Sequence, residues 1–505
     1  MELPLPSLWR LIAGVAVASV LYVLFKPLAS PLRHVPGPFL ARYTRLWLLK
    51  EVYLGTYPQT SIRLHKRYGP IVRIAPNEYS IDDPAAAKTI YGSGKGFVKS
   101  PWYSASRNPV HAIPNLFAEA DPHVHAQDRR KIAAAYSMTN LVQLEPFIDD
   151  CTGLLEHRLN ELAEANTAMD VSHWMQCYAF DVIGKMTLGK RFGFLDRGED
   201  IQGIMASLHK FFIYGARVGV FPEWHKFLFT RQMQSPKVSG LGHVRQFAYA
   251  QFDEKCEAFD TDGGNGVESN TSDDFMTRFL RIQSQDPSKL SNHDIRSVCM
   301  MNIGAGSDTT SIGMTSVILH LMKHPEVLDK LREEIRTFEL QGELSDPIKF
   351  SEAKKMPYLQ AVLKEALRMH PATGLSLGRI VPPEGADLAG QYFPPGTVVG
   401  INAWVAHANK KVFGSDADTF RPERWLEDAQ VVREREAYFM SFGQGSRTCI
   451  GKNISLMELS KTIPQIFRRY NLVADTESGE PEYSTENVWF VKIMDLHCRV
   501  HKIHV

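Results

Sequence analysis

The sequence of 505 residues is poor in the features that mark several large protein classes. Its formal net charge is only +1 and it has no long run of like charge, so it shows no sign of a nucleic-acid partner. It contains no internal repeat, which excludes repeat architectures. Hydrophobic residues make up 44% and charged residues 22%, values that exclude a disordered or fibrous chain. A small molecule is the better expectation for a substrate.

Cysteine is scarce as well. The six cysteines lie far apart and form no CxxC pair, which argues against a disulfide framework and against a zinc site, and indicates a reducing compartment. One of them, Cys449, lies in a distinctive sequence context. The others are interpreted as small buried hydrophobic side chains: Cys151, Cys177, Cys256, Cys299 and Cys498.

Residues 11–25 form an uncharged apolar run that is short for a membrane span, since a bilayer core takes about 20 residues. A secretory signal is the alternative, but its only cleavage-like triplet, residues 16–18, lies inside the run. We therefore predict an uncleaved membrane anchor over residues 1–26. More basic residues follow the run than precede it, which predicts a cytosolic main domain at the endoplasmic reticulum membrane: Lys26, Arg33, Arg42 and Arg45 against Arg10 and Glu2.

A proline-rich linker is predicted over residues 27–38, and residues 39–505 are expected to form one domain. Alternating β-branched residues and turn signals predict strands over 68–81, 376–401 and 487–500. Many helices between small strand regions indicate a mainly α (α+β) domain with small sheets. Apolar spacings of three and four predict these helices over 123–138, 141–165, 171–188, 203–214, 240–258, 292–323, 325–340, 357–370 and 451–469.

Residues 442–451 read FGQGSRTCIG and directly precede a long helical pattern. Gly443, Gly445 and Gly451 permit tight turns and the close approach of a flat cofactor, and Arg447 offers a fixed cation for a carboxylate. A helix N-terminus lowers a thiol pKa, so Cys449 stands where a metal-binding thiolate persists. A buried thiol in a glycine-rich turn is the alternative, but the spaced elements of F-G-x-G-x-R-x-C-x-G favour an iron ligand of the heme-thiolate type.

This segment resembles the heme-binding signature of the cytochrome P-450 superfamily. The resemblance implies a b-type heme, iron protoporphyrin IX, bound by the thiolate of Cys449, whose electron donation helps to cleave the O–O bond of dioxygen. It also implies cofactor contacts by Phe442, Gly443 and Arg447. A single helical domain with small β-sheets is the fold that goes with it.

Residues 303–310 read IGAGSDTT within a long predicted helix. Glycines there weaken the helix by about 1 kcal/mol each relative to alanine, so they need a reason. Close helix packing is one reason. The other is space for dioxygen against the heme at Ala305 and Gly306, with Asp308 and Thr309 as a carboxylate and hydroxyl proton relay. The segment is similar to the superfamily's oxygen-activation motif at every position, which implies the second reason.

Glu365 and Arg368 lie three residues apart on one helix face, where a solvated salt bridge is the ordinary interpretation. The pair resembles the superfamily's E-x-x-R, and FRPERW at 420–425 resembles the loop that joins it, with Arg424 as the matching residue. The resemblance implies a buried network that builds the heme pocket.

His125 and Arg129 lie one helical turn apart in HAQDRRK, a spacing that an exposed basic face explains equally well. In the superfamily, residues at this spacing reach a heme propionate. Arg379, in LGRIVPP, resembles a third propionate contact on a strand. Arginine suits such contacts because its guanidinium binds a carboxylate in bidentate fashion.

The resemblance extends from the PGP at 36–38 to the terminal strands, and residues 67–92 are similar to the fungal microsomal branch of pisatin demethylase-like and secondary-metabolite oxidases. It implies a monooxygenase that takes electrons from NADPH through a separate NADPH-cytochrome P-450 reductase, with cytochrome b5 as a further partner. One atom of O2 would enter a C–H or double bond of a hydrophobic molecule. Two alternatives stay open: heme-thiolate chemistry without a reductase (isomerisation, dehydration, ring formation or peroxygenation), and a non-catalytic heme-binding protein.

In the superfamily, the substrate pocket lies between residues 102–117, 211–229, 302–305, 372–377 and 488–490. These segments are apolar and aromatic, which indicates a hydrophobic substrate. Core packing is the alternative for each aromatic residue. The predicted wall residues are Trp102, Phe117, Phe211, Phe212, Trp224, Leu375 and Trp489.

Overall fold

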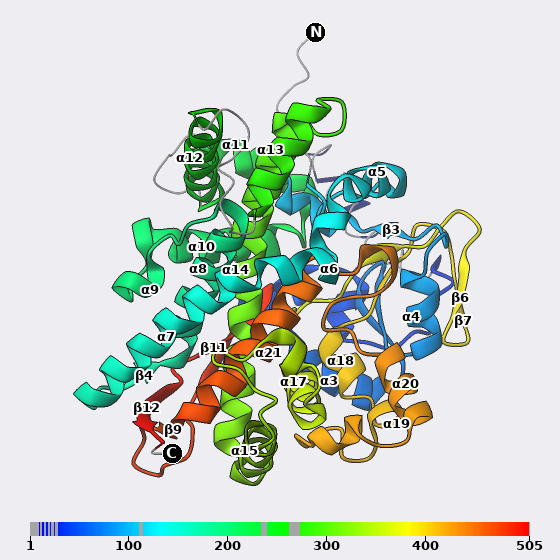
Figure 1. The fold of residues 1–505 in the computed structure, drawn as a ribbon. Helices are drawn as coiled ribbons and strands as arrows, with labels where there is room; N and C mark the ends of the chain where they lie inside the picture. Colours follow the sequence, from blue (N-terminus) through cyan, green and yellow to red (C-terminus); the bar gives the residue numbers. More distant parts are fainter. Residues whose placement is uncertain are drawn as a thin grey trace.

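The computed structural model describes residues 30–110, 115–233, 240–261 and 273–503, with isolated residues between 10 and 29. In this part of the chain helices dominate and small sheets lie beside them, so the predicted mainly helical domain is confirmed (Figure 1). The predicted anchor over 1–26 falls almost entirely outside the described residues. Among those that are described, no helix is both long and apolar enough to cross a membrane.

One long helix, α14 (Asn292–Lys323), runs through the centre of the molecule (Figure 1). Its first turn is closed by a capping box, in which Ser291 and Asp294 each accept a hydrogen bond from the other's backbone amide. From residue 307 onward most of its side chains are buried, because other helices pack around it: α8 (Val171–Leu188), α17 (Pro357–Met369) and α21 (Lys452–Arg469).

The other long helices follow the predicted pattern, with one difference. Residues 123–138 do not form one helix, since α5 (Pro122–Ile132) passes into a 3-10 turn and Ser137 then takes an extended backbone. The second predicted helix therefore starts later, with a proline in the first turn of α7. The bounds of the long helices are α7 (Glu145–Ala165), α10 (Ile204–Val218), α12 (Gly240–Thr261) and α15 (Pro325–Leu340).

Periodicity did not predict several shorter helices, which offer too few turns for a clear pattern. They are α2 (Leu46–Tyr53), α3 (Tyr57–Tyr68), α4 (Pro84–Tyr91), α6 (Met138–Leu141), α9 (Phe194–Arg197), α11 (His225–Met233), α13 (Phe275–Gln285), α16 (Phe350–Ala353), α18 (Ala403–His407), α19 (Lys410–Phe413) and α20 (Ala429–Ala437). The 3-10 helices are η1 (Phe39–Arg42), η2 (Pro101–Ser106), η3 (Ala133–Tyr136), η4 (Val142–Leu144), η5 (Ile201–Gly203), η6 (Pro222–Trp224), η7 (Pro422–Trp425) and η8 (Gly445–Arg447).

The largest sheet joins segments about 300 residues apart in sequence, in the order β1-β2-β8-β5-β3. Strand β2 pairs in parallel with β8, and β8 pairs antiparallel with β5. Strand β3 then pairs with β5, which places Lys99 directly opposite Arg379. The bounds are β1 (Ile71–Ala75), β2 (Glu78–Ile81), β3 (Val98–Lys99), β5 (Arg379–Ile380) and β8 (Val398–Gly400).

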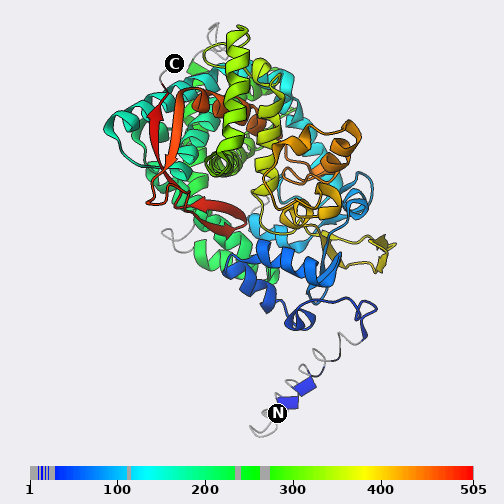
Figure 2. The ribbon, with the colours of Figure 1, turned by 90° about the horizontal axis from the view of Figure 1, so that it is seen from below.

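Smaller sheets complete the fold, and the hairpin β10-β11 lies beside α10, near the N-terminal helices (Figure 2). Trp489, between the two hairpin strands, has a φ of 89°, a left-handed conformation that side chains other than glycine rarely adopt. The bounds are β4 (Met169–Asp170), β6 (Ala386–Leu388), β7 (Gln391–Phe393), β9 (Tyr470–Ala474), β10 (Ser484–Val488), β11 (Phe490–Met494) and β12 (His497–Lys502).

Candidate active site

Cys449 lies in a tight loop that ends where α21 begins. The Cys449 amide donates to the carbonyl of Phe442 at 2.9 Å, and the Thr448 amide donates to the carbonyl of Gly445 at 3.1 Å. Arg129 of α5 reaches the same loop and donates to the carbonyl of Thr448 at 2.8 Å. The loop is thus held both by its own backbone and by a helix more than 300 residues earlier.

The thiol of Cys449 is enclosed by protein and yet open on one side. Burial raises its pKa, while the amides of Gly451 and Lys452 and the charge of Arg129 act in the opposite direction. Its side chain nevertheless has accessible surface. A thiol enclosed in this way and facing the positive end of a helix is suited to bind a metal ion, which would deprotonate it.

Cationic side chains converge near this loop. Lys99 and Arg379 are buried and face each other across paired strands, an arrangement that destabilises a sheet unless an anion lies between the charges. Burial, followed by Arg379 and Arg447, lowers the pKa of Lys99 to about 6. Burial, followed by Arg447 and Lys99, lowers the pKa of His125 to about 3, so this histidine is neutral.

Protein carboxylates compensate these charges only in part. Glu119 lies near the cationic group but forms a salt bridge with Arg107. The Arg447 guanidinium donates to the backbone carbonyls of Glu119 and Ala120, at 2.8 and 3.1 Å. Burial and the charge of Arg379 lower the pKa of Arg447 to about 10. The cluster therefore fits a ligand that brings anionic groups of its own, as the two propionates of heme do.

The comparisons with known proteins agree with this donor set of one thiolate and several cations. Residues 36–495 match the family Cytochrome P450. The chain belongs to the cytochrome P450 family. A pisatin demethylase of Fusarium vanettenii is 36% identical over 94% of this chain and 90% of its own length. A cytochrome P450 monooxygenase of Aspergillus terreus is 37% identical over 87% of this chain and 90% of its own length.

As a cytochrome P450, the protein is a monooxygenase-family enzyme whose cofactor is heme with a cysteine thiolate as axial ligand. Cys449 is the cysteine in the signature segment, and the geometry of its loop fits that ligand. The propionate contacts predicted for Arg129, Arg379, Arg447 and His125 stay predictions, and the structure brings all four side chains to the same region. Lys99 belongs to this group too.

The predicted charge network is present and fully buried. The Glu365 carboxylate accepts from Arg368 at 2.7 and 2.9 Å and from Arg424 at 2.8 Å. The indole of Trp425 donates to Glu365 at 2.9 Å. Arg368 also donates to the carbonyls of His407 and Ala417, which ties α17 to the segment that follows the sheet.

His407 connects this network to the cysteine loop. Its Nδ1–H donates to the carbonyl of Arg368 at 2.9 Å, and its Nε2 accepts from the amide of Met440 at 2.8 Å. Burial and the charge of Arg368 lower the pKa of His407 to about 3, which keeps the ring neutral, so that one nitrogen can donate a hydrogen bond while the other accepts one. Ser441 donates to the carbonyl of Leu367 at 2.7 Å. The segment that directly precedes Phe442 is therefore held against α17 by these hydrogen bonds.

The IGAGSDTT segment lies in the middle of α14, and its residues separate onto two sides. Ala305 is exposed, and the Thr309 hydroxyl donates to its carbonyl at 2.9 Å. A Cβ on Gly306 would lie 3.0 Å from the side chain of Ile183 of α8, a tight contact, so this glycine allows the two helices to pack closely. The predicted contact of Gly306 with the cofactor stays a prediction.

Asp308 is fully buried and is held on the α8 side of α14. Its carboxylate lies 3.2 Å from the ammonium of Lys492 in β11 and accepts a hydrogen bond from Gln176 of α8. Neither partner was predicted, because strand β11 and helix α8 are far from Asp308 in sequence. The predicted relay of Asp308 with Thr309 is therefore not formed directly in this arrangement.

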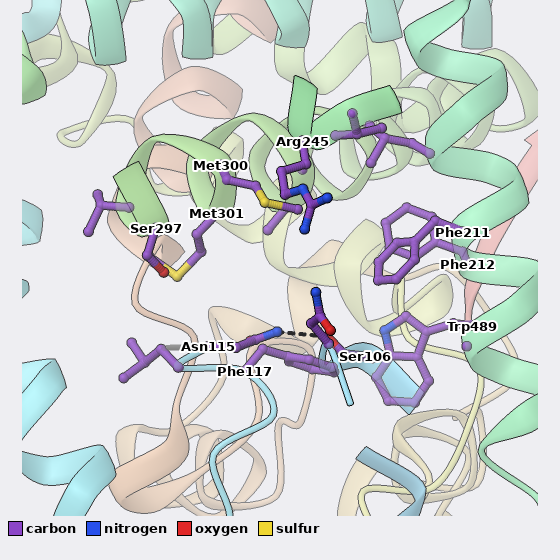
Figure 3. A pocket seen from close by; sticks show the side chains of 18 of the residues that line it. Ser106, Asn115, Phe117, Phe211, Phe212, Arg245, Ser297, Met300, Met301 and Trp489 are labelled. Atoms are coloured by element: carbon purple, nitrogen blue, oxygen red, sulfur yellow. Dashed lines mark hydrogen bonds between the residues drawn. The ribbon is translucent and has the colours of Figure 1, made fainter. Parts of the chain in front are cut away.

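A cavity of about 230 Å³ lies beside α14, and Gly304 and Ala305 of that helix form part of its wall. Of the predicted wall residues, Trp102, Phe117, Phe211, Phe212 and Trp489 line it (Figure 3). The rings of Trp102 and Trp489 stack with their centroids 4.3 Å apart. An apolar, aromatic cavity of this kind suits a hydrophobic ligand with few polar groups.

Two predicted wall residues, Trp224 and Leu375, are not among the residues that line this cavity. Trp224, the last residue of η6, is 56% exposed on the surface. Leu375 packs in an apolar cluster with Val72 and Ile74 of the sheet. Sequence analysis also missed Arg245, Met300 and Met301, which line the cavity from the N-terminal halves of α12 and α14. Their helical periodicity alone does not distinguish a cavity wall from a buried core face.

Proposed function

We propose that the protein is a reductase-dependent monooxygenase that hydroxylates or epoxidises a hydrophobic small molecule in fungal secondary metabolism. Its bound heme would supply the chemistry that splits O2, with one oxygen atom entering the substrate and the other leaving as water. Two electrons from NADPH and two protons balance that reaction. The single observation that carries the proposal is the apolar cavity whose wall includes Ala305, one helical turn before Thr309.

The residues of the chain have distinct parts in this proposal. Cys449 holds the iron, and the cationic group around Arg447 and Arg379 orients the propionates. Among the described residues the Thr309 hydroxyl donates to one acceptor, the carbonyl of Ala305 in its own helix, and it thus holds a proton close to Ala305. Asp308 would pass on a proton that it takes up from solvent after it leaves Lys492, whose ammonium holds the carboxylate now and is partly exposed to solvent.

Reductase dependence separates this proposal from its alternative, heme-thiolate chemistry such as isomerisation, dehydration, ring formation or peroxygenation. Holoenzyme would be incubated with NADPH, an NADPH-cytochrome P450 reductase and isotopically labelled dioxygen, against a panel of fungal metabolites. We expect label in the product only when the reductase is present. Product without reductase, or without label, would support the alternative. Addition of cytochrome b5 to the same assay tests that partner.

The heme ligand has its own spectroscopic test. The reduced carbon monoxide complex of the wild-type protein should show the red-shifted Soret band that a thiolate ligand gives, and Cys449→Ala should lose it. Cys498→Ala is the matched control, because this cysteine of β12 is buried and binds no cofactor in this proposal. A folded, heme-loaded protein without the band would contradict the thiolate ligand.

We also propose that residues 1–26 anchor the protein to the endoplasmic reticulum membrane, with the catalytic domain in the cytosol. The apolar run over 11–25 and the basic residues after it support this topology. Phe39 and Leu40 of η1 are 72% and 54% exposed, apolar side chains that suit contact with lipid next to an anchor. Carbonate-resistant membrane association of the full chain, lost on removal of residues 1–26, is the expected result. Full extraction of the intact chain would contradict it.

A further inference from the structure

One charged side chain of the cavity beside α14, Arg245 of α12, has no oppositely charged partner among the described residues, unlike Asp128, Lys131 and Asp294. Its guanidinium points into the cavity, across from Phe117 and beside Met300 (Figure 3). Among the described residues, Arg245 has neither a carboxylate partner nor a hydrogen-bond acceptor. Arginine does not lose its proton in proteins, so this charge persists whatever fills the cavity.

The acidic residues of the same cavity are already engaged. Asp294 accepts hydrogen bonds from the amide and hydroxyl of Ser291 at 3.0 and 2.7 Å, and lies 3.0 Å from the ammonium of Lys131. Asp128 shares that ammonium at 3.4 Å. Two carboxylates thus share one lysine at one part of the wall, and Arg245 stands alone at another. An anion in the cavity would be repelled by the first group and attracted by the second.

The cost of covering Arg245 decides which ligands suit the cavity. A neutral apolar molecule would displace water from the guanidinium and leave its donors unpaired, which is unfavourable. A carboxylate would instead pair with it in bidentate fashion, and such charge-assisted pairs are strong where water is excluded. The wall therefore selects for a ligand with an acidic group at one end and an apolar body.

The register between α12 and α14 sets the size of that ligand. Asp253 of α12 pairs with Arg296 of α14, and Cys299 lies 3.8 Å from the carbonyl of Ala248, so the helices run antiparallel. Continuing this register places Arg245 level with Asn302, about 5 Å along the axis from Ala305. Packed helices lie about 8–10 Å apart. The acidic group and the site of oxidation are therefore close together, which excludes a long chain between them.

The aromatic walls set the shape of the apolar body. Phe211, Phe212, Phe117 and Trp489 stand around the space below Arg245 (Figure 3). Flat faces and edges of this kind favour stacked or edge-on contact with an aromatic ring. We propose that Arg245 binds the carboxylate of a compact aromatic acid, which is the substrate class of this enzyme. This inference rests on the proposed function.

The test compares a carboxylic acid with its neutral ester in the heme-loaded full chain. The probes are 2-naphthoic acid and methyl 2-naphthoate, and binding is measured by isothermal titration calorimetry at neutral pH. We expect the wild-type protein to bind the acid about 10- to 100-fold more tightly than the ester, the effect of one charge-assisted pair. Arg245→Gln should abolish this preference by weakening the binding of the acid, while the ester should bind as tightly as before or more tightly, because no guanidinium is left to desolvate. Arg245→Lys should retain part of the preference.

The matched control is Arg130→Gln, which removes an exposed arginine of α5 outside the cavity and should leave both affinities unchanged. Equal binding of acid and ester by the wild-type protein, binding of neither probe, or a preference that survives Arg245→Gln would overturn the inference. The carbon monoxide spectrum of each preparation keeps the two proposals apart. Its thiolate band tests the proposed function, whereas a preparation that has the band but no preference for the acid contradicts only the role of Arg245.

Discussion

At the scale of single residues, the loop before α21 depends on glycines for two different reasons. Gly443 and Gly445 both have a φ of 66°, which costs other residues about 1–2 kcal/mol. A Cβ on Gly443 would meet its nearest neighbour, in Leu377, at 3.8 Å, an ordinary contact. A Cβ on Gly445 would lie 1.8 Å from the carbonyl oxygen of Tyr91, a backbone atom of α4. Only the second position combines backbone strain with a severe overlap.

We therefore predict that Gly445→Ala loses more of its bound heme than Gly443→Ala, in which the strained backbone lowers stability by about 1–2 kcal/mol. The overlap in Gly445→Ala can be relieved only by moving the loop that carries Cys449 away from α4. The ratio of heme to protein after gel filtration measures the difference. Equal retention by the two variants would show that the loop is more adaptable than its contacts indicate.

The Thr309 hydroxyl donates a hydrogen bond to the carbonyl of Ala305, which lines the cavity. We predict that Thr309→Ala binds heme normally and continues to consume NADPH, while product per NADPH falls about 10- to 100-fold because the proton relay is broken. The matched control is Thr337→Ala in α15, where the hydroxyl makes the same hydrogen bond to the carbonyl four residues earlier, at 2.8 Å. Unchanged coupling in Thr309→Ala would remove this residue from the relay.

At the scale of elements, α17 supports the cysteine loop through buried charge. Its pair Glu365 and Arg368 is 0% and 1% exposed, and Arg424 of η7 joins it with 0% exposure. Removing one partner of a buried pair leaves the other charge uncompensated, which costs about 3–5 kcal/mol. The same helix carries an exposed pair, Lys364 with Glu436, whose contribution is about 0–1 kcal/mol.

This contrast gives a prediction with an internal control. Glu365→Gln should lower the free energy of unfolding by about 3–5 kcal/mol, because it leaves the buried charge of Arg368 uncompensated. It should also reduce heme retention, because His407 connects Arg368 to Met440 near the cysteine loop by hydrogen bonds. Glu436→Gln, which removes a carboxylate close in sequence to the loop, should change stability by no more than about 1 kcal/mol. Urea unfolding of both holoenzymes tests this. Similar losses would mean that burial does not decide the cost.

At the scale of the whole molecule, buried histidines make stability depend on pH. Burial lowers the pKa of His65 and His370 to about 4 and that of His407 to about 3. A histidine with a depressed pKa binds more protons unfolded than folded, so stability is fully present above the unfolded pKa of about 6.5 and is lost as pH falls toward the folded value. Buried acids with raised pKa, such as Asp82, act in the opposite direction.

A variant comparison isolates one histidine from the others. A histidine whose pKa falls from about 6.5 in the unfolded chain to about 3 in the folded one lowers the free energy of unfolding by about 2 kcal/mol at pH 5 relative to pH 8. We predict that His407→Gln is less stable than wild type at pH 8 but loses about 2 kcal/mol less between pH 8 and pH 5. The exposed His157, replaced in the same way, should leave the wild-type dependence intact. Denaturant midpoints at the two pH values test this, and parallel curves for all three proteins would contradict it.

The family, the heme ligand and most long helices could be predicted from the sequence because their signals are local. The spacing around Cys449 lies within ten residues, and the apolar periodicity of α14 and α21 repeats every turn. Short helices and two-residue strands such as β3 lack such repetition. Their bounds depend on partners that arrive much later in the chain, as β5 does for β3.

The sequence by itself determined the family, and it predicted which residues carry the chemistry, because Cys449, Thr309 and the Glu365 motif stand in fixed local spacings. Only the tertiary structure decided how they are partnered. Lys492 reaches Asp308 from a distant strand, and Arg245 of α12 lines the cavity beside α14 without a carboxylate partner among the described residues. The physical reason is that charge compensation depends on distance in space, whereas a spacing in sequence records only distance along the chain.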